Sequence, residues 1–342
     1  MSAVRSPFVH LSCHPDQVLW AKDEVPSLFN GIADVFHLDP SVNRTDFLAS
    51  FQPGGPFEGA VGLFRKNHST ARIGLFDKEL INALPSSIAW IAHVGAGYDQ
   101  VDAGACKARG IRLSNTPHAV DDATATTSLY LLISTMRCFS KAERSVRAGL
   151  WKSQHSAAHA HDLSGKAVAI LGLGGIGLRF AELVRAFPMR VLYHSRRKVA
   201  HAPEWCEYYD AGRLDEMLAQ ADALSIHVPL NEHTAGMVDE KMIRKLKKGA
   251  VIVNTARGKV TDEEAMMRAL QDGHLSGVGL DVYPDEPNVD PRWLDFPNVT
   301  LLPHIGTGTL ESAKALEVRA LENLRDFLVA GAGKDLVPEF MQ

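Results

Sequence analysis

A glycine-rich turn between an apolar strand and a helix constrains the fold of this chain more than any other feature. Ala167–Leu171 is a short apolar run, and Gly172, Gly174 and Gly177 follow it in the pattern G-x-G-x-x-G. Apolar residues at helical spacing then run through 178–184. Gly172 permits the tight turn, Gly174 lets a pyrophosphate approach the backbone, and Gly177 lets the helix pack on the strand. The helix start offers unpaired N–H groups to phosphates, so this stretch predicts a dinucleotide site.

The end of the next strand indicates which dinucleotide is bound. In an NAD enzyme the second strand ends in an Asp or Glu that binds the ribose 2′-OH. Here the strand predicted at 189–194 is followed by Ser195, Arg196 and Arg197. A carboxylate would repel a 2′-phosphate, whereas a hydroxyl and two guanidinium groups would bind it. A solvated basic turn is the alternative, but we predict that NADP(H) is preferred and that NAD(H) is also possible.

Length and composition are those of a two-domain globular protein. The chain has 342 residues, of which 46% are hydrophobic and 22% charged. A net charge of −4 gives no reason to expect nucleic acid or an anionic membrane as a partner. The four cysteines form no C-x-x-C pair, which is typical of reduced intracellular thiols. The sequence shows neither a signal-peptide pattern nor an apolar run of membrane-spanning length, so we expect a cytoplasmic location.

Apolar strand-like runs alternate with helical stretches along the chain, which predicts an α/β fold with parallel sheets. Strands are predicted near 8–12, 33–38, 60–64, 88–94, 111–115, 167–171, 190–194, 207–209, 223–228, 250–254, 275–281 and 299–303. Helices are predicted at 18–29, 44–50, 77–84, 101–109, 119–147, 214–220, 239–246, 262–271 and 310–330. The last helix has no strand after it. We therefore expect 1–117 and 307–342 to form a substrate domain, and 118–306 to form the dinucleotide-binding domain.

Charged side chains stand at the ends of three successive strands in the second half. Arg257, Glu286 and His304 each follow a predicted buried strand. Ligands of open parallel sheets bind at the carboxyl ends of the strands, so we expect these side chains in one cleft. Arg suits a substrate carboxylate, and His exchanges protons near neutral pH beside a carboxylate that orients it. A surface ion pair, a loop charge and a core histidine are the alternatives for each residue alone.

Three histidines follow the longest helical stretch, at His155, His159 and His161. His155 and His159 have the i,i+4 spacing that metal ligands use on a helix. No acidic or thiol side chain stands at ligand spacing beside them. We therefore predict a polar connector or a subunit contact here, and no metal site.

With these features the chain resembles the D-isomer-specific 2-hydroxyacid dehydrogenases, from about residue 60 to 337. Besides the glycine turn, the motifs that carry the resemblance are Gly95-Ala-Gly-Tyr-Asp99, Asn115-Thr-Pro117, Asp122-Ala-Thr124, Asn254-Thr-Ala-Arg-Gly258, Asp281-Val-Tyr-Pro-Asp-Glu-Pro287 and Pro303-His-Ile-Gly306. The resemblance implies two doubly wound parallel-sheet domains, a Rossmann dinucleotide domain and a discontinuous flavodoxin-like substrate domain. It implies NAD(P)H-dependent, reversible reduction of a 2-oxo acid to the D-2-hydroxy acid. It also implies a homodimer formed through the dinucleotide domain, with 119–165 contributing.

The resemblance further implies roles for single residues. Arg257 would hold the substrate's carboxylate and carbonyl oxygen, and Glu286 would hydrogen-bond His304, which would donate the proton. The backbone N–H groups of Gly95, Ala96 and Gly97 would bind the carboxylate, with Val94 beside them. The implied cofactor contacts are Thr124, Gly172, Gly174, Gly175, Ile176, Gly177, Ser195, Arg196, Arg197, Val228, Pro229, Thr234, Thr255, Ala256, Arg257, Asp281, His304 and Gly306.

Two positions bear on the choice of substrate. Residues 74–80 and 95–102 look closest to the glyoxylate and hydroxypyruvate reductase branch. Val94, however, stands where those reductases have a polar Asn, and Gly306-Thr-Gly-Thr309 has glycine where they have a bulky aromatic residue. Both changes would make the pocket more apolar and roomier, as in the D-mandelate dehydrogenases of the same family. A neutral change in packing is the alternative.

Two other functions share the fold. Formate dehydrogenases pair the catalytic His with Gln, whereas this chain has Glu286. C-terminal-binding co-repressors keep the Arg, Glu and His and use the dinucleotide to switch assembly. They carry a longer flexible C-terminal extension, whereas this chain stops at Gln342, soon after its last predicted helix. We therefore expect a metabolic enzyme, with a dinucleotide-sensing co-repressor as the alternative.

Overall fold

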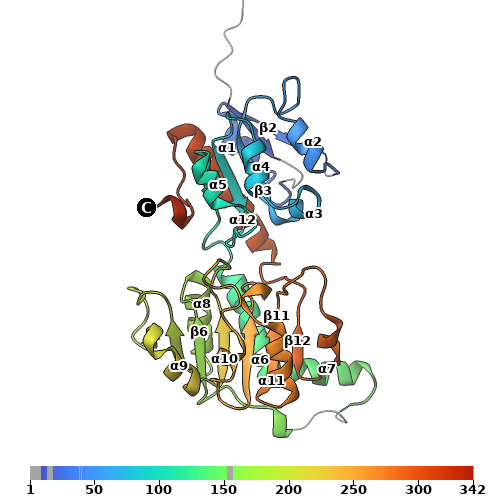
Figure 1. Cartoon of the computed structure of the whole chain (residues 1–342), viewed down its shortest axis with the longest axis vertical. Coiled ribbons are helices and arrows are strands. Elements are labelled where there is room, and N and C mark those ends of the chain that lie inside the picture. The colour runs from blue at the N-terminus through green and yellow to red at the C-terminus, as the bar shows by residue number, and fades with distance from the viewer. Residues whose placement is uncertain (1–8, 14–17, 38, 40, 152–156, 342) are drawn as a thin grey trace, which may run out of the picture. The chain divides into compact units, whose positions relative to one another are not determined.

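The computed structural model describes residues 9–13, 18–37, 39, 41–151 and 157–341, and the chain folds into two compact units (Figure 1). The first unit comprises 1–120 and 309–342, and the second comprises 121–308. These boundaries lie three and two residues beyond those expected from the sequence. The first unit is discontinuous because the last helix, α12 (Leu310–Ala330), packs on strands β3 (Ala60–Lys66) and β4 (Trp90–Val94).

The first unit is built on a sheet of five parallel strands in the order β2-β1-β3-β4-β5, the order of flavodoxin-like folds. The other strands are β1 (Val9–Cys13), β2 (Ala33–His37) and β5 (Arg112–Ser114). Its helices besides α12 are α1 (Val25–Phe29), α2 (Arg44–Ala49), α3 (Thr70–Ile73), α4 (Lys78–Ala83) and α5 (Ala103–Ala108). Phe47, Phe51, Phe57 and Phe76 lie in its buried apolar core.

The second unit is built on seven parallel strands in the order β12-β11-β10-β9-β6-β7-β8, which contains the Rossmann order. The strands are β6 (Ala167–Leu171), β7 (Arg190–His194), β8 (Cys206–Tyr209), β9 (Ala223–Ile226), β10 (Ala250–Asn254), β11 (Leu275–Leu280) and β12 (Val299–Leu301). The helices are α6 (Asp121–Met136), α7 (Phe139–Arg147), α8 (Gly175–Val184), α9 (Leu214–Gln220), α10 (Glu240–Ile243) and α11 (Glu263–Gln271). The predicted α/β class with two doubly wound parallel sheets is confirmed.

Strand β6 shows why the sequence of this sheet is apolar without alternation. Val168 and Ile170 lie in one buried cluster, whereas Ala169 and Leu171 lie in another. Successive side chains of a strand point to opposite faces, so both faces of the sheet are buried. A continuous apolar run is the pattern that such a strand requires.

The helix predicted at 18–29 is wrong over its first part, since only Val25–Phe29 is helical. The backbone N–H groups of Leu19, Trp20 and Ala21 donate to the buried carboxylate of Glu317 on α12, at 3.1, 2.7 and 2.9 Å. Those groups are therefore satisfied by a side chain and do not enter a helical ladder. The helix instead begins where Pro26 fixes its first turn.

The single helix predicted over 119–147 is two helices, α6 and α7. Cys138 separates them with φ of 54°, in the left-handed region that interrupts a right-handed helix. The helix predicted at 239–246 is likewise shorter and spans Glu240–Ile243. By contrast, α12 spans 310–330 as predicted, begins at a Thr309 cap and ends at Gly331 with φ of 70°.

Candidate active site

The glycine turn joins β6 to α8, as the sequence predicts. Gly172 has φ of 92°, and a Cβ there would lie 2.9 Å from the carbonyl oxygen of His227. A Cβ on Gly177 would lie 2.2 Å from the carbonyl oxygen of Gly172, so the helix start packs directly on the turn. The Cβ position of Gly174 has no heavy atom within 4 Å. The turn is therefore tightly packed below and open at Gly174, where a phosphate would approach.

The residues around this turn fit a dinucleotide. Within the described part of the chain, the N–H groups of Gly175, Ile176 and Gly177 have no hydrogen-bond acceptor, and the first bond at the helix start joins Leu178 N–H to Gly174 at 2.8 Å. The Oγ1 of Thr124 is buried and has no partner among the same residues. Free N–H groups and the positive end of α8 attract phosphate oxygens. A bound ligand would also satisfy Thr124, which otherwise carries a desolvation cost.

The segment after β7 combines a structural hydroxyl with two exposed cations. The Oγ of Ser195 accepts a hydrogen bond from the N–H of Leu173 in the glycine turn, at 3.1 Å. Arg196 and Arg197 are exposed and make no ion pair with any described residue. Ser195 is therefore fixed beside the turn, and the two guanidinium groups remain able to bind an anion.

Glu286 and His304 form a hydrogen-bonded pair in the second unit. The distance between His304 Nδ1 and Glu286 Oε2 is 2.6 Å, and Tyr283 N–H donates to Glu286 Oε1 at 2.9 Å. Burial alone raises the pKa of Glu286, but the hydrogen bonds from His304 and Tyr283 outweigh it, so the pKa is lowered overall. The carboxylate is therefore ionised near neutral pH and orients the imidazole. Because Nδ1 is engaged, Nε2 is the nitrogen that can exchange a proton with a ligand.

Buried Asp281 holds the segment that follows His304. Its two oxygens accept hydrogen bonds from the N–H groups of Ile305 and Gly306, at 2.8 and 2.7 Å. Burial raises the pKa of Asp281, and the two backbone hydrogen bonds oppose that rise. His304 has φ of 55°, a conformation that costs energy in a residue with a Cβ. The two hydrogen bonds of Asp281 stabilise the segment in this conformation.

Arg257 lies in the turn after β10, against the Glu286 loop. A Cβ on Gly258 would lie 2.0 Å from the carbonyl carbon of Tyr283, so the two loops touch. The guanidinium of Arg257 donates to the carbonyl of Ala256 at 2.7 Å, and its charge helps to lower the pKa of Glu286. The structure thus brings Arg257, Glu286 and His304 together, as the sequence predicts for three neighbouring strand ends.

Most of the remaining cofactor candidates lie next to the glycine turn or to Asp281, and Thr234 does not. Thr255 shares a hydrogen bond of 2.7 Å with Ser128 on α6. A Cβ on Gly306 would lie 2.9 Å from Asp281 and 3.5 Å from Thr124, so these three residues are neighbours. Val228 borders Gly172.

Thr234, by contrast, uses its hydroxyl within its own loop. It donates to the carbonyl of Pro229 at 2.5 Å and accepts from the N–H of Asn231 at 2.9 Å. The role of Thr234 in this structure is to shape the 229–234 loop. Whether it also contacts the cofactor stays a prediction.

The Val94–Gly97 segment belongs to the first unit and begins at the last residue of β4. Gly95 N–H donates to Thr116 Oγ1 at 2.9 Å, so this amide already has a partner. No described residue accepts from the N–H groups of Ala96 and Gly97. Two of the three predicted substrate-binding amides are therefore open. Asn115 and Thr116, which hydrogen-bond this segment, belong to the motif Asn115-Thr-Pro117, and the sequence alone indicates no role for either residue.

The described ranges contain no group of three or more His, Cys, Asp and Glu that could hold a metal ion. His155 lies outside those ranges. No helix in them is long and apolar enough to cross a membrane.

Comparisons with known proteins agree on one family. Residues 129–306 match the model of the D-isomer specific 2-hydroxyacid dehydrogenase, NAD binding domain. A 4-methyl-2-oxopentanoate reductase A of Aspergillus oryzae is 41% identical over 88% of this chain and 90% of that protein. Among solved structures, a glyoxylate reductase from Paecilomyes thermophila superposes with a TM-score of 0.91 at 39% identity, covering 98% of this chain and 99% of that one. The holo form of Rhodotorula graminis D-mandelate dehydrogenase gives a TM-score of 0.89 at 27% identity, covering 97% and 98%.

Proposed function

The chain belongs to the D-isomer-specific 2-hydroxyacid dehydrogenase family, and from this premise we propose that it reduces a 2-oxo acid to the D-2-hydroxy acid with a nicotinamide dinucleotide. The observation that carries the proposal is the pairing of His304 Nδ1 with Glu286 Oε2 at 2.6 Å, beside Arg257. In this proposal His304 is the proton donor, Glu286 is the carboxylate that orients it, and Arg257 is the cation that binds an anionic substrate. The family resemblance found in the sequence is confirmed.

The reaction needs a hydride and a proton. The dinucleotide supplies the hydride when it is bound. His304 Nε2 gives the proton to the carbonyl oxygen, and Glu286 stabilises the charged imidazole before that step. Arg257 binds the substrate's carboxylate and the carbonyl oxygen through its planar fork. Asp281 keeps the His304 segment in place through the amides of Ile305 and Gly306.

Steady-state loss of NADPH absorbance with a panel of 2-oxo acids tests the proposal. We expect turnover that depends on His304 and a product of D configuration. Tight dinucleotide binding without turnover of any 2-oxo acid would contradict it and favour the co-repressor alternative. Chiral analysis of the product distinguishes this family from L-specific enzymes.

For the substrate class we propose that larger apolar 2-oxo acids are preferred over glyoxylate and hydroxypyruvate. Val94 is buried and apolar, and Gly306 and Gly308 follow the catalytic histidine. The similar proteins include a 4-methyl-2-oxopentanoate reductase and a D-mandelate dehydrogenase as well as glyoxylate reductases. We expect a higher kcat/KM for 4-methyl-2-oxopentanoate and phenylglyoxylate than for glyoxylate, and Val94→Asn should narrow the difference. A wild-type preference for glyoxylate would overturn this.

We further propose that NADPH is preferred over NADH, supported by Ser195, Arg196 and Arg197 after β7. A homodimer is proposed as well, formed through α6, α7 and the turn that follows them. Exposed apolar side chains gather on this stretch, namely Tyr130, Phe139, Val146, Leu150 and Trp151. The cytoplasmic location stays a prediction.

A further inference from the structure

Every carbonyl of the Gly95–Gly97 segment is held by a donor from the first unit. Gly95 C=O accepts the N–H of Thr116 at 3.0 Å. Ala96 C=O accepts from Asn115 Nδ2 at 2.7 Å, and Gly97 C=O pairs with His93 Nε2 at 2.9 Å. Three successive peptide groups of one short loop are thus fixed by three separate donors.

The tautomer of His93 follows from its partners. Buried Arg65 places NH1 3.0 Å from His93 Nδ1, and a guanidinium can only donate, so Nδ1 accepts. Nε2 therefore carries the proton that it donates to Gly97. Arg65 is itself held by Thr70 at 2.6 Å and Gln100 at 2.9 Å. The donor below the loop is consequently rigid.

Peptide geometry turns these contacts into a direction for the amides. The C=O and N–H of a planar trans peptide point in opposite directions. Holding the carbonyl of Gly95 on the protein side turns the N–H of Ala96 away from it. Holding the carbonyl of Ala96 does the same for the N–H of Gly97. These are the two amides of the segment that no described residue accepts from.

We infer that Asn115 and His93 are positioning residues, which hold the peptides of this loop so that the amides of Ala96 and Gly97 bind the substrate's carboxylate. Successive N–H groups directed to one side form a known type of anion site. The inference rests on the proposed function. The inference leaves out the amide of Gly95, which the sequence resemblance includes among the carboxylate-binding groups, because the N–H of Gly95 donates to Thr116.

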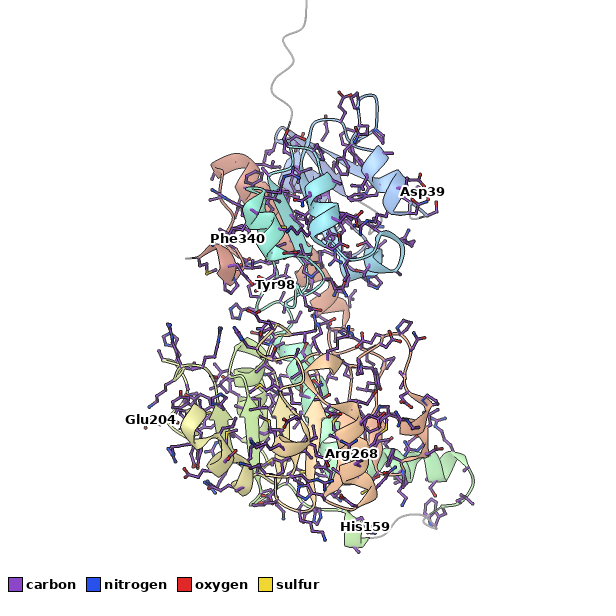
Figure 2. All side chains as sticks on the ribbon, viewed as in Figure 1. Asp39, Tyr98, His159, Glu204, Arg268 and Phe340 are labelled. Atoms are coloured by element: carbon purple, nitrogen blue, oxygen red, sulfur yellow. The ribbon has the colours of Figure 1, made fainter. Side chains whose placement is uncertain are left out.

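The C-terminal residues hold the same loop from its other end. Asn115 N–H donates to the carbonyl of Asp335 at 3.1 Å, and Tyr98 Oη donates to Glu339 at 3.0 Å. Figure 2 labels Tyr98 and Phe340, which both pack against the apolar core of the first unit. Asn115 is therefore fixed at its backbone, and its side chain is left to orient Ala96.

Asn115→Leu tests the inference, with Ser114→Ala as the matched control. Leu has the same branching and the same number of side-chain heavy atoms as Asn but removes the donor to Ala96. Ser114 is the residue before Asn115, and its Oγ accepts a buried hydrogen bond of 2.9 Å from Trp90 Nε1. Ser114→Ala removes that hydrogen bond and leaves the contacts of the Gly95–Gly97 loop in place. We expect Asn115→Leu to raise the KM for the 2-oxo acid about 10- to 100-fold, the equivalent of one hydrogen bond to a charged group. The Kd for NADPH should stay unchanged in both variants, and the KM should stay near wild type in Ser114→Ala.

His93 gives an independent test with a built-in rescue. His93→Gln keeps a donor near the position of Nε2, whereas His93→Leu removes it. We expect a raised KM in His93→Leu and substantial recovery in His93→Gln. Equal KM values in the Asn115→Leu and Ser114→Ala variants, or parallel loss of NADPH binding, would overturn the inference.

The outcomes separate this inference from the proposed function. If the wild type turns over no 2-oxo acid, the proposed function is wrong. Crystal structures of the wild type and Asn115→Leu then decide the positioning role alone. We expect the peptide between Ala96 and Gly97 to turn in the variant. An unchanged peptide would contradict the inference.

Discussion

At the scale of single residues, the proposed proton transfer depends on His304 and on the side chains that contact its segment. Glu286 pairs with Nδ1 of His304 and so leaves Nε2 for proton exchange. Asp281 accepts hydrogen bonds from the two backbone amides that follow His304 and fixes their position. The lowered pKa of Glu286 results from burial being outweighed by its hydrogen bonds. Removing His304 and removing Glu286 should therefore change different quantities: kcat in the first case and the pH–rate profile in the second.

His304→Asn should lower kcat about 10²–10⁴-fold, the usual contribution of general acid catalysis. NADPH binding, measured by fluorescence titration, should be nearly unchanged because the phosphates bind elsewhere. A variant that retains wild-type kcat would exclude His304 as the proton donor.

Glu286→Gln should move the basic limb of the pH–rate profile for reduction to lower pH. The sign follows from charge: the ionised carboxylate favours a positive charge beside it, and the neutral amide of Gln does not. Because the pKa of Glu286 is lowered in the fold, the carboxylate is present throughout this range. A profile that does not move would contradict the pairing in solution.

Arg196→Ala should weaken kcat/KM for NADPH about 10- to 100-fold and leave NADH nearly unaffected. A charged hydrogen bond to the 2′-phosphate is worth roughly 1.5–3 kcal/mol. Ser195→Asp should invert the preference by repelling the phosphate and accepting from the ribose hydroxyl. Part of its effect will come from the lost hydrogen bond to Leu173, for which Ser195→Ala is the control. Equal use of both cofactors by the wild type would sink the proposal.

Sequence patterns could predict the charged site residues and the pairing of Glu286 with His304, but not the residues that hold the Gly95–Gly97 loop. Arg257, Glu286 and His304 stand at the ends of apolar strands, and parallel topology brings such ends together. Asn115 and His93, in contrast, act through contacts with Ala96 and Gly97. Those contacts depend on side-chain directions that apolar periodicity does not encode.

At the scale of elements, a histidine with a lowered pKa, His227, directly follows β9. His227 lies against Phe180, with 5.2 Å between ring centroids, and shares a hydrogen bond of 2.8 Å with Ser225. Burial lowers the pKa of His227 from 6.5 to about 3. Its backbone also packs under Gly172. A proton on this ring would therefore disturb the support of the glycine turn.

The stability of the protein should consequently fall at acidic pH. Well above pH 6.5 the ring is neutral in both states and contributes almost no pH dependence. Below it the unfolded chain binds a proton that the folded chain does not, so the free energy of unfolding falls by up to about 2 kcal/mol at pH 5. The loss should be smaller than this limit because the residue keeps some exposure to solvent.

Urea unfolding at pH 7.5 and 5.0 measures this loss. His227→Asn cannot take up the proton and should show a smaller difference between the two pH values. The other titrating groups are common to both proteins and cancel in the comparison. The same difference in both proteins would rule out His227 as the cause.

Element boundaries were predictable where a local signal marks them. Thr309 and Gly331 bound α12 through a side-chain cap and a left-handed residue. The break at Cys138 has no such signal, since neither Arg137 nor Cys138 excludes a helix by propensity. The first part of the helix predicted at 18–29 failed because Glu317, almost 300 positions away, takes its N–H groups. Local pattern cannot report a distant competitor.

For the whole molecule, the exposed apolar residues of α7 and the following turn predict self-association. Trp151 is 71% and Val146 56% exposed. Monomeric proteins rarely expose several large apolar side chains in one stretch, and such patches are typical of interaction surfaces. The double variant Val146→Glu with Trp151→Ser should shift sedimentation from dimer to monomer at micromolar concentration. Exposed Val329→Glu on α12 is the control. A wild type that sediments as a monomer would contradict the homodimer.

The return of α12 to the first sheet has a consequence for the order of events during synthesis. Glu317 binds the backbone of residues 19–21, and β3 and β4 pack on α12, so the first unit needs residues that leave the ribosome after the whole of 121–308. The unit formed by 121–308 is contiguous and has all its strands before then. The first unit should therefore stay partly folded and accessible to chaperones during synthesis, while the second unit, although it is synthesised later, folds before it.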